Sequence, residues 1–318
     1  MSESIVDPSN RYLRCEVRQK INRTTVYKCL DQEESSPADW YEISIENMPP
    51  ESLSSLKVFM TSFSQIKHPN LLQISRAWLD SARKTFVYVT EVFSRKTLRN
   101  YLTELTTRPA TSVISKWCIQ ILNGLMALHN AVPPIIHNDL TCNNIYIDVN
   151  TGIIKIGIPS FEAVLFNWIS PVAPIEVQKG LAEPRSDVWS LGLCVIEMAT
   201  GEQPYSDKPS PKDSILKGES PSSVGQVSDP SVADFITCCL LPVDMRPSTQ
   251  ALFEYTLISE NYEPPPADPE PSAIQQLQAK QKSEYDNLLA RQEKERRELI
   301  AKIKARLKKT ASLRDLLK

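Results

Sequence analysis

Glycine is scarce in this chain, and long apolar runs are missing. Only eight of its 318 residues are glycine, and none of them comes before Gly124. A loop whose backbone lies closely over phosphate groups needs residues without a Cβ atom, so a glycine-rich phosphate loop is excluded before Gly124. No apolar stretch is long enough to span a bilayer, and the first residues lack the basic and apolar regions of a signal peptide. The composition, 41% hydrophobic, predicts a soluble globular protein without a transmembrane segment.

The cysteines do not form a pattern that binds metal or builds a disulfide framework. There are seven of them, an odd number, and apart from the adjacent Cys238 and Cys239 no pair spacing stands out. This argues against a disulfide-stabilised fold and against a structural zinc site. A reducing compartment follows. We expect the protein in the cytoplasm, and composition does not separate this from the nucleus.

The last part of the chain differs chemically from the rest. Residues 273–318 hold thirteen Lys+Arg against six Asp+Glu, a net +7, although the whole chain has a net charge of −2. The segment has no Pro or Gly and a strongly helical composition. An acidic segment with five prolines, 261–272, precedes it and is predicted to be a stiff extended linker.

The predicted helix at 273–318 carries a narrow apolar stripe. Leucines at 277, 288 and 299 repeat every eleven residues, a period that winds a coiled coil weakly to the right. Three interpretations remain open: a coiled-coil seam for self-association, a helix that docks into a groove of a partner protein, and a single solvated helix. Interspersed glutamates and scarce aromatic residues argue against nucleic acid as the partner.

Short strands are predicted first along the chain, and helices afterwards. Residues 11–46 contain three apolar and β-branched runs, and 86–90 is a further strand. Between them, Glu51 to Phe63 places apolar residues on one helical face after two prolines. From Leu98 onward the periodicity is mainly helical.

One polar loop, 137–144, lies between two apolar runs and places Asp139 and Asn144 five residues apart. This is the spacing of the H-R-D-x-x-x-x-N motif in protein kinases. In that chemistry, the aspartate accepts the proton of the attacking hydroxyl group and the asparagine holds a magnesium ion. The spacing therefore points to a phosphoryl-transfer loop or to a descendant of one.

Five further segments stand out along the chain: TVYK at 25–28, PPIIHNDLTC at 133–142, KIG at 155–157, IEMAT at 196–200 and PYS at 204–206. Together with the order of the elements, they resemble the protein-kinase fold over residues 10–260. The likeness is closest to the with-no-lysine kinases and to their degenerate relatives, the nuclear receptor-binding protein family.

The resemblance implies a two-lobed α+β fold. The small, mainly antiparallel β lobe with one helix would comprise about residues 10–92, and the larger helical lobe about 97–260. A short N-terminal tail, 1–9, would precede the domain, and the extended helix of 273–318 would follow it.

The resemblance also implies that the phosphate-handling parts have changed. The glycine positions of the phosphate loop fall near Gln19, Ile21 and Thr24, and none is glycine. The strand lysine that pairs with the α- and β-phosphates is expected close to Tyr41, but no lysine lies between Lys28 and Lys57. Its glutamate partner is expected near Phe59, on a helix that holds no acid from Ser52 to Lys67.

The metal-handling motif is altered in the same way. In kinases, the D-F-G motif supplies a carboxylate to magnesium, but here Ile158, Pro159 and Ser160 stand in its place. Asn138 replaces the arginine that binds a phosphorylated activation loop, and Thr141 replaces the lysine that contacts the transferring phosphate.

Residues that would hold the fold together are retained. Asp187 matches the aspartate of the central helix that bonds to the catalytic-loop backbone. Arg246 matches the arginine that pairs with the glutamate of the A-P-E motif, here Glu176. We interpret His137 as a packed loop residue. Since losing one partner of a buried ion pair costs several kcal/mol, these residues are interpreted as structural.

These observations predict a pseudokinase that acts as a scaffold or adaptor in intracellular signalling or trafficking. Asp139 would be a remnant base, no cofactor would be required, and partners would be proteins bound through the kinase-like domain and the C-terminal helix. Thr90, Glu91 and Val92 would be the hinge positions if a nucleotide binds.

The alternative is an atypical active serine/threonine kinase of the with-no-lysine type. It would use ATP and Mg²⁺, with Asp139 as base and Asn144 as metal ligand. Lys20 or Lys28 would then replace the missing strand lysine.

Overall fold

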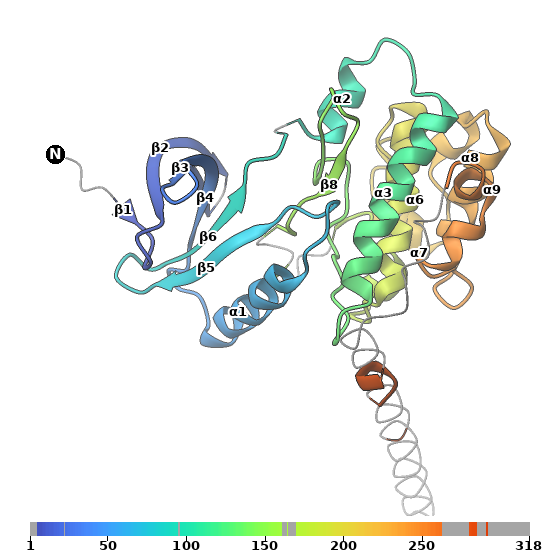
Figure 1. Ribbon diagram of the computed structural model, residues 1–318. Coiled ribbons are helices and arrows are strands. Elements are labelled where there is room, and N and C mark those ends of the chain that lie inside the picture. Colours follow the sequence, from blue (N-terminus) through green and yellow to red (C-terminus); the bar gives the residue numbers. More distant parts are fainter. Residues whose placement is uncertain are drawn as a thin grey trace, which may run out of the picture. The chain divides into compact units, whose positions relative to one another are not determined.

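The first part of the chain forms a six-stranded antiparallel sheet in the order β1-β2-β3-β4-β6-β5 (Figure 1). The computed structural model describes residues 5–21, 23–94, 96–160, 164, 170–262, 280–284 and 291. The strands are β1 (Ile5–Val6), β2 (Tyr12–Ile21), β3 (Thr24–Asp31), β4 (Ser36–Ser44), β5 (Ile74–Asp80) and β6 (Thr85–Glu91). In β4, Trp40 is fully buried and meets Trp78 edge to face, with ring centroids 4.8 Å apart. The predicted antiparallel lobe is confirmed.

The predicted N-terminal tail is shorter than expected. Instead of ending at residue 9, it gives way to β1, which pairs with β2. The Asp7 carboxylate is buried, accepts a hydrogen bond from the Tyr12 N–H at 2.7 Å and contacts Arg76 at 3.1 Å. A two-residue strand leaves no period-2 pattern, so its sequence gave no strand signal.

One helix, α1 (Pro50–Gln65), packs beside the sheet. It begins directly after Pro49, where a proline at the first helical position lacks only an N–H that would have no intrahelical partner. Leu56, Met60 and Phe63 are its buried residues. The helix predicted from the apolar face is confirmed and extends by a residue or two at each end.

The second lobe is helical, with a two-stranded ribbon. Its elements are α2 (Leu98–Glu104), α3 (Thr111–His129), β7 (Ile145–Ile147), β8 (Ile154–Ile156), α5 (Ile175–Gln178), α6 (Pro184–Thr200), α7 (Pro211–Leu216), η1 (Ser222–Gln226), α8 (Pro230–Cys239), η2 (Ala251–Glu254) and α9 (Thr256–Ser259). Helix α6 is the most buried, with α3 and α8 packed on it (Figure 1). A Cβ on Gly192 of α6 would lie 2.7 Å from Cys239 Cβ, so the glycine permits this close packing.

The chain divides into two compact units, 1–262 and 263–318. In the second unit only 280–284 and 291 are described, and they are helical. The predicted linker at 261–272 and the coiled-coil interpretation of 273–318 therefore lie almost entirely outside the described residues. Along the described part of the chain, no helix has the length and apolar character needed to cross a bilayer.

Candidate functional site

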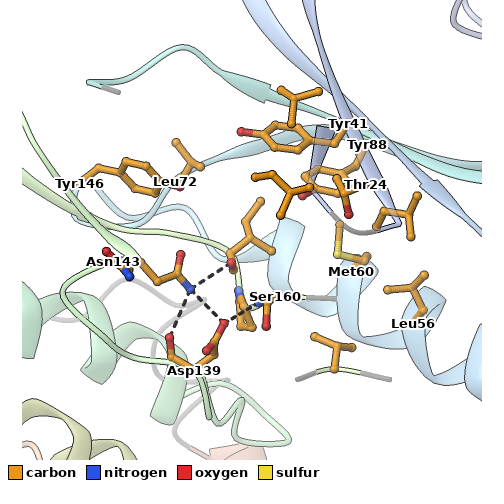
Figure 2. Close-up of a pocket in the computed structure, with 17 residues that line it drawn as sticks. Thr24, Tyr41, Leu56, Met60, Leu72, Tyr88, Asp139, Asn143, Tyr146 and Ser160 are labelled. Atoms are coloured by element: carbon orange, nitrogen blue, oxygen red, sulfur yellow. Dashed lines mark hydrogen bonds between the residues drawn. The ribbon is translucent and has the colours of Figure 1, made fainter. Parts of the chain in front are cut away.

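A hollow of about 460 Å³ lies between the sheet and the loop 137–144 (Figure 2). Strands β3, β4 and β6 line one wall, α1 lines a side, and residues of the loop together with 158–160 form the floor. Figure 2 shows Tyr41 and Tyr88 across the hollow from Asp139. The hollow brings together Asp139, Asn144 and Tyr41, which the sequence had placed in one site.

Asp139 is held by short-range hydrogen bonds on the floor of the hollow. Its Oδ2 accepts the Ser160 N–H at 2.7 Å and lies 3.5 Å from the Asn144 side-chain nitrogen. That nitrogen also donates to the carbonyl oxygens of Asp139 and Ile158, at 3.3 and 3.2 Å. These contacts fix the positions of Asp139 and Asn144 without a metal ion.

The buried side of the same loop is anchored by Asp187 at the start of α6. Its fully buried carboxylate accepts the backbone N–H groups of His137 and Asn138, both at 2.8 Å, and contacts His129 Nε2 at 2.8 Å. Burial alone would raise the pKa of Asp187, but the hydrogen bond and charge of His129 and the backbone donors outweigh it and lower the pKa. The carboxylate therefore stays ionised and holds the loop backbone.

His137 links the loop to the strand that follows it. Its Nδ1 accepts the Asp139 N–H at 3.3 Å, and its Nε2 donates to the Gly157 carbonyl at 3.0 Å. This pattern fits a neutral imidazole protonated at Nε2. The ring is buried and engaged on both nitrogens, in keeping with a packed loop histidine.

The predicted pair between Glu176 and Arg246 is present in the core of the helical lobe. Arg246 Nη1 lies 2.6 Å from Glu176 Oε1 and also donates to the Arg185 carbonyl at 2.8 Å. The same Glu176 oxygen accepts the Ser186 hydroxyl at 3.1 Å. Both partners are buried, so the pair joins α5 to the loop after α8.

Among the described residues, the floor offers one carboxylate, Asp139, where a metal-bound triphosphate needs two. Ile158 stands at the position of the second and packs its side chain against the core. Over the described parts of both lobes, no group of three His, Cys, Asp or Glu residues is placed to hold a metal ion. Mg²⁺ requires several oxygen ligands, so the residues present do not fit a magnesium triphosphate.

The wall above carries no positive charge among the described residues that line the hollow. At the lysine position, Tyr41 stacks on Tyr88 with ring centroids 4.6 Å apart and planes 4° from parallel. Thr24 also lines the hollow. Burial raises the pKa of Tyr41, so its hydroxyl stays protonated at neutral pH.

The substitute cations lie elsewhere. The exposed Lys28 forms an ion pair with Glu16, and Lys20 is exposed on β2. Arg23 donates to the Glu46 carbonyl at 3.1 Å. The described residues that line the hollow include none of these three cations.

The helix α1 contributes apolar groups instead of an acid. Leu56 and Met60 line the hollow, whereas Phe59, near which the glutamate was expected, packs on Phe63 with ring centroids 5.7 Å apart. No acidic residue stands on this face of α1 in place of the expected glutamate.

A smaller hollow of about 170 Å³ adjoins the first at the end of β6. Of the three proposed hinge positions, Thr90 and Glu91 line it and Val92 does not, whereas Phe93 does. The strand ends at Glu91, so side-chain alternation no longer predicts which residue turns inward. The Glu91 carboxylate is bound by Lys155, at 2.6 Å.

The smaller hollow also contains an ion pair that sequence analysis missed. Arg18 of β2 pairs with the buried Asp39 of β4, and both line the hollow. Strand β3 lies between β2 and β4, so the pair spans two strand spacings. An aspartate beside the buried Trp40 was the available signal, because a buried carboxylate requires a partner.

This arrangement defines a kinase fold: two lobes, with the Asp139–Asn144 loop facing the hollow between them. Residues 24–255 match the family described as "Protein tyrosine and serine/threonine kinase". The match covers most of the chain, so the chain belongs to this family.

Curated proteins with similar sequences include serine/threonine-protein kinase WNK8 of Arabidopsis thaliana, 34% identical over 77% of this chain and 46% of that protein. Probable serine/threonine-protein kinase WNK10 of the same plant is 32% identical over 80% of this chain and 51% of that protein. Serine/threonine-protein kinase pkpA of Phycomyces blakesleeanus is 30% identical over 74% of this chain and 39% of that protein.

The predicted likeness to with-no-lysine kinases is thereby confirmed. The chain spans about half the length of the first two relatives and less of the third. The likeness to the nuclear receptor-binding protein family stays a prediction.

Proposed function

We propose that this protein is a pseudokinase that acts as a scaffold or adaptor and does not transfer phosphate. The observation that carries this proposal is the lining of the 460 Å³ hollow, in which the described residues supply one carboxylate and no cation. Phosphoryl transfer depends almost wholly on positioning and on electrostatic stabilisation of the phosphate oxygens. The described residues of this site include neither the strand lysine nor the catalytic-loop lysine of a kinase, and they include no second carboxylate for the metal. They therefore supply neither the positioning nor the electrostatic stabilisation that the reaction needs.

The expected loss is large. Each 1.36 kcal/mol of lost transition-state stabilisation lowers a rate about tenfold. Removing two lysines and one metal carboxylate together corresponds to roughly five powers of ten, although such effects do not add strictly.

Scaffolding is supported by a third hollow, of about 450 Å³, in the helical lobe. Leu181 lines it with 67% of its surface exposed, and Met245, which lies in the sequence between the lining residues Asp244 and Arg246, is 68% exposed. The exposed carboxylates of Glu219 and Asp244 line it together with one exposed lysine, Lys179. These features fit a partner protein that inserts an apolar side chain next to a basic residue.

A phosphotransfer assay tests the proposal. The purified full chain is incubated with labelled ATP, Mg²⁺ or Mn²⁺ and a general protein substrate, with an active protein kinase in parallel. We expect incorporation no higher than that of an Asp139→Ala variant. Robust incorporation that Asp139→Ala abolishes would overturn the proposal and favour the alternative, an active serine/threonine kinase.

One observation favours that alternative: Asp139 and Asn144 remain adjacent on the floor. In an active kinase, Lys20 or Lys28 would supply the missing cation, and Lys28 would have to leave Glu16 to reach a phosphate. Under this alternative, either Lys20→Ala or Lys28→Ala lowers the incorporation, whereas under our proposal neither change has an effect.

A further inference from the structure

The hollow between the lobes has the opposite charge to the one that a nucleotide requires. Asp139 is the one ionised group among the described residues that line it. Its Oδ2 is occupied by the Ser160 N–H, while within the described residues its Oδ1 accepts no hydrogen bond. One carboxylate oxygen is therefore available to a ligand that donates.

The walls around this carboxylate are aromatic and apolar. Tyr41, Tyr88 and Tyr146 line the hollow together with Leu72 and Met60. Burial raises the pKa of all three tyrosines, so none supplies a second negative charge near neutral pH. Aromatic rings also attract cations through their π-electrons.

The volume suits a small molecule. Ligand sites in proteins measure roughly 300–1,000 Å³ and combine mostly apolar walls with a few polar groups. The hollow, at about 460 Å³, has this size and this composition. In an apolar enclosure, a lone carboxylate favours a cation and disfavours an anion.

We propose that this hollow binds an organic cation: a compact, mainly apolar amine that is protonated at neutral pH. Its protonated nitrogen pairs with Asp139, and its apolar part lies along Tyr41 and Met60 on the opposite side (Figure 2). The inference rests on the proposed function, because a hollow that steadied a magnesium triphosphate could not also prefer a cation.

Three acridines of nearly the same shape provide the probes. Proflavine is cationic at pH 7.5, acridine is neutral and acridine-9-carboxylate is anionic. Each is titrated into the full chain and followed by fluorescence, with stoichiometry from calorimetry. We expect proflavine to bind one site about tenfold or more tightly than acridine, and acridine-9-carboxylate to bind most weakly.

Matched variants locate the site. Asp139→Asn keeps the shape of the side chain and removes its charge, so it abolishes the preference for proflavine over acridine. Asp234→Asn changes the net charge equally on the exposed surface of α8 and leaves the preference intact. Met60→Trp fills the hollow and weakens all three probes, whereas Val58→Trp, at a position of α1 that is 67% exposed, has no effect.

The order of the three probes on the unmodified protein decides the question even if a variant fails to fold. Equal binding of proflavine and acridine, tightest binding of the anion, or no binding of any probe would each overturn the inference. So would full proflavine preference in folded Asp139→Asn. Failure of the proposed function gives a different result, namely phosphate incorporation that depends on Asp139.

Discussion

The buried face of the loop 137–144 and the face toward the hollow differ in the charged groups that they carry. On the buried face, the Asp187 carboxylate accepts two backbone N–H groups and a histidine contact. On the face toward the hollow, Asp139 is joined by Ile158 and Tyr41, which stand where the likeness to kinases predicts a metal-binding carboxylate and a phosphate-binding lysine. The comparison teaches that the buried anchors hold the loop backbone, whereas the side chains toward the hollow can change without disturbing those anchors.

Removing one partner of the buried pair of Glu176 and Arg246 should lower the stability of the protein most. Arg246→Ala leaves Glu176 as an uncompensated buried carboxylate and removes a bond to the Arg185 carbonyl. We expect the free energy of unfolding to fall by about 3–5 kcal/mol, measured by chemical denaturation. Lys28→Ala, which breaks an exposed ion pair, is the control and should change stability by less than about 1 kcal/mol. Similar losses in both variants would contradict the buried-anchor account.

Asp187→Asn tests the anchor of the loop itself. An amide has one acceptor oxygen for three converging donors, so we expect a loss of about 2–3 kcal/mol at pH 7.

The effect should also depend on pH. The folded-state pKa of Asp187 lies below its ordinary value of 3.8, so its contribution is fully present above that value and is lost as the pH falls through the folded pKa. The stability difference between the two proteins should therefore shrink below about pH 4. Thermal unfolding of the unmodified protein and of Asp187→Asn, from pH 7 to pH 3, measures this stability difference. If the difference grows as the pH falls, the pKa of Asp187 is not lowered by folding.

Gly157→Ala tests the packing around Asn144 without changing any charge. A Cβ there would lie 2.1 Å from Asn144 Oδ1 and 2.8 Å from Tyr146 Cε2, so Asn144 must move. We expect a loss of about 1–3 kcal/mol in denaturation experiments. Gly225→Ala is the matched control, since no atom lies within 4 Å of its added Cβ. Equal stability of both variants would mean that Asn144 is not held as described.

The smallest effect should come from the face toward the hollow. Asp139→Asn keeps an oxygen that can accept the Ser160 N–H. We expect the free energy of unfolding to change by no more than about 1 kcal/mol, again by denaturation. A loss as large as that of Asp187→Asn would show that Asp139 is an anchor as well, and the contrast between the faces would disappear.

Much of this architecture could be predicted from the sequence. The period-2 runs gave the strands, the apolar face gave α1, and the spacing of Asp139 and Asn144 gave the loop. The pair of Glu176 and Arg246 followed from the likeness to kinases.

What could not be predicted depends on contacts across the chain. The pair of Arg18 and Asp39 spans two strand spacings, and β1 is too short for any periodic signal. The inward turn of Phe93 in place of Val92 follows from the backbone after β6, which residue alternation does not describe.

Calorimetric titration of the full chain with ATP, in Mg²⁺ and separately in a metal chelator, tests the central claim most directly. The account predicts no binding that depends on Mg²⁺. Saturable binding of ATP that requires Mg²⁺, and that Asp139→Asn abolishes, would contradict it.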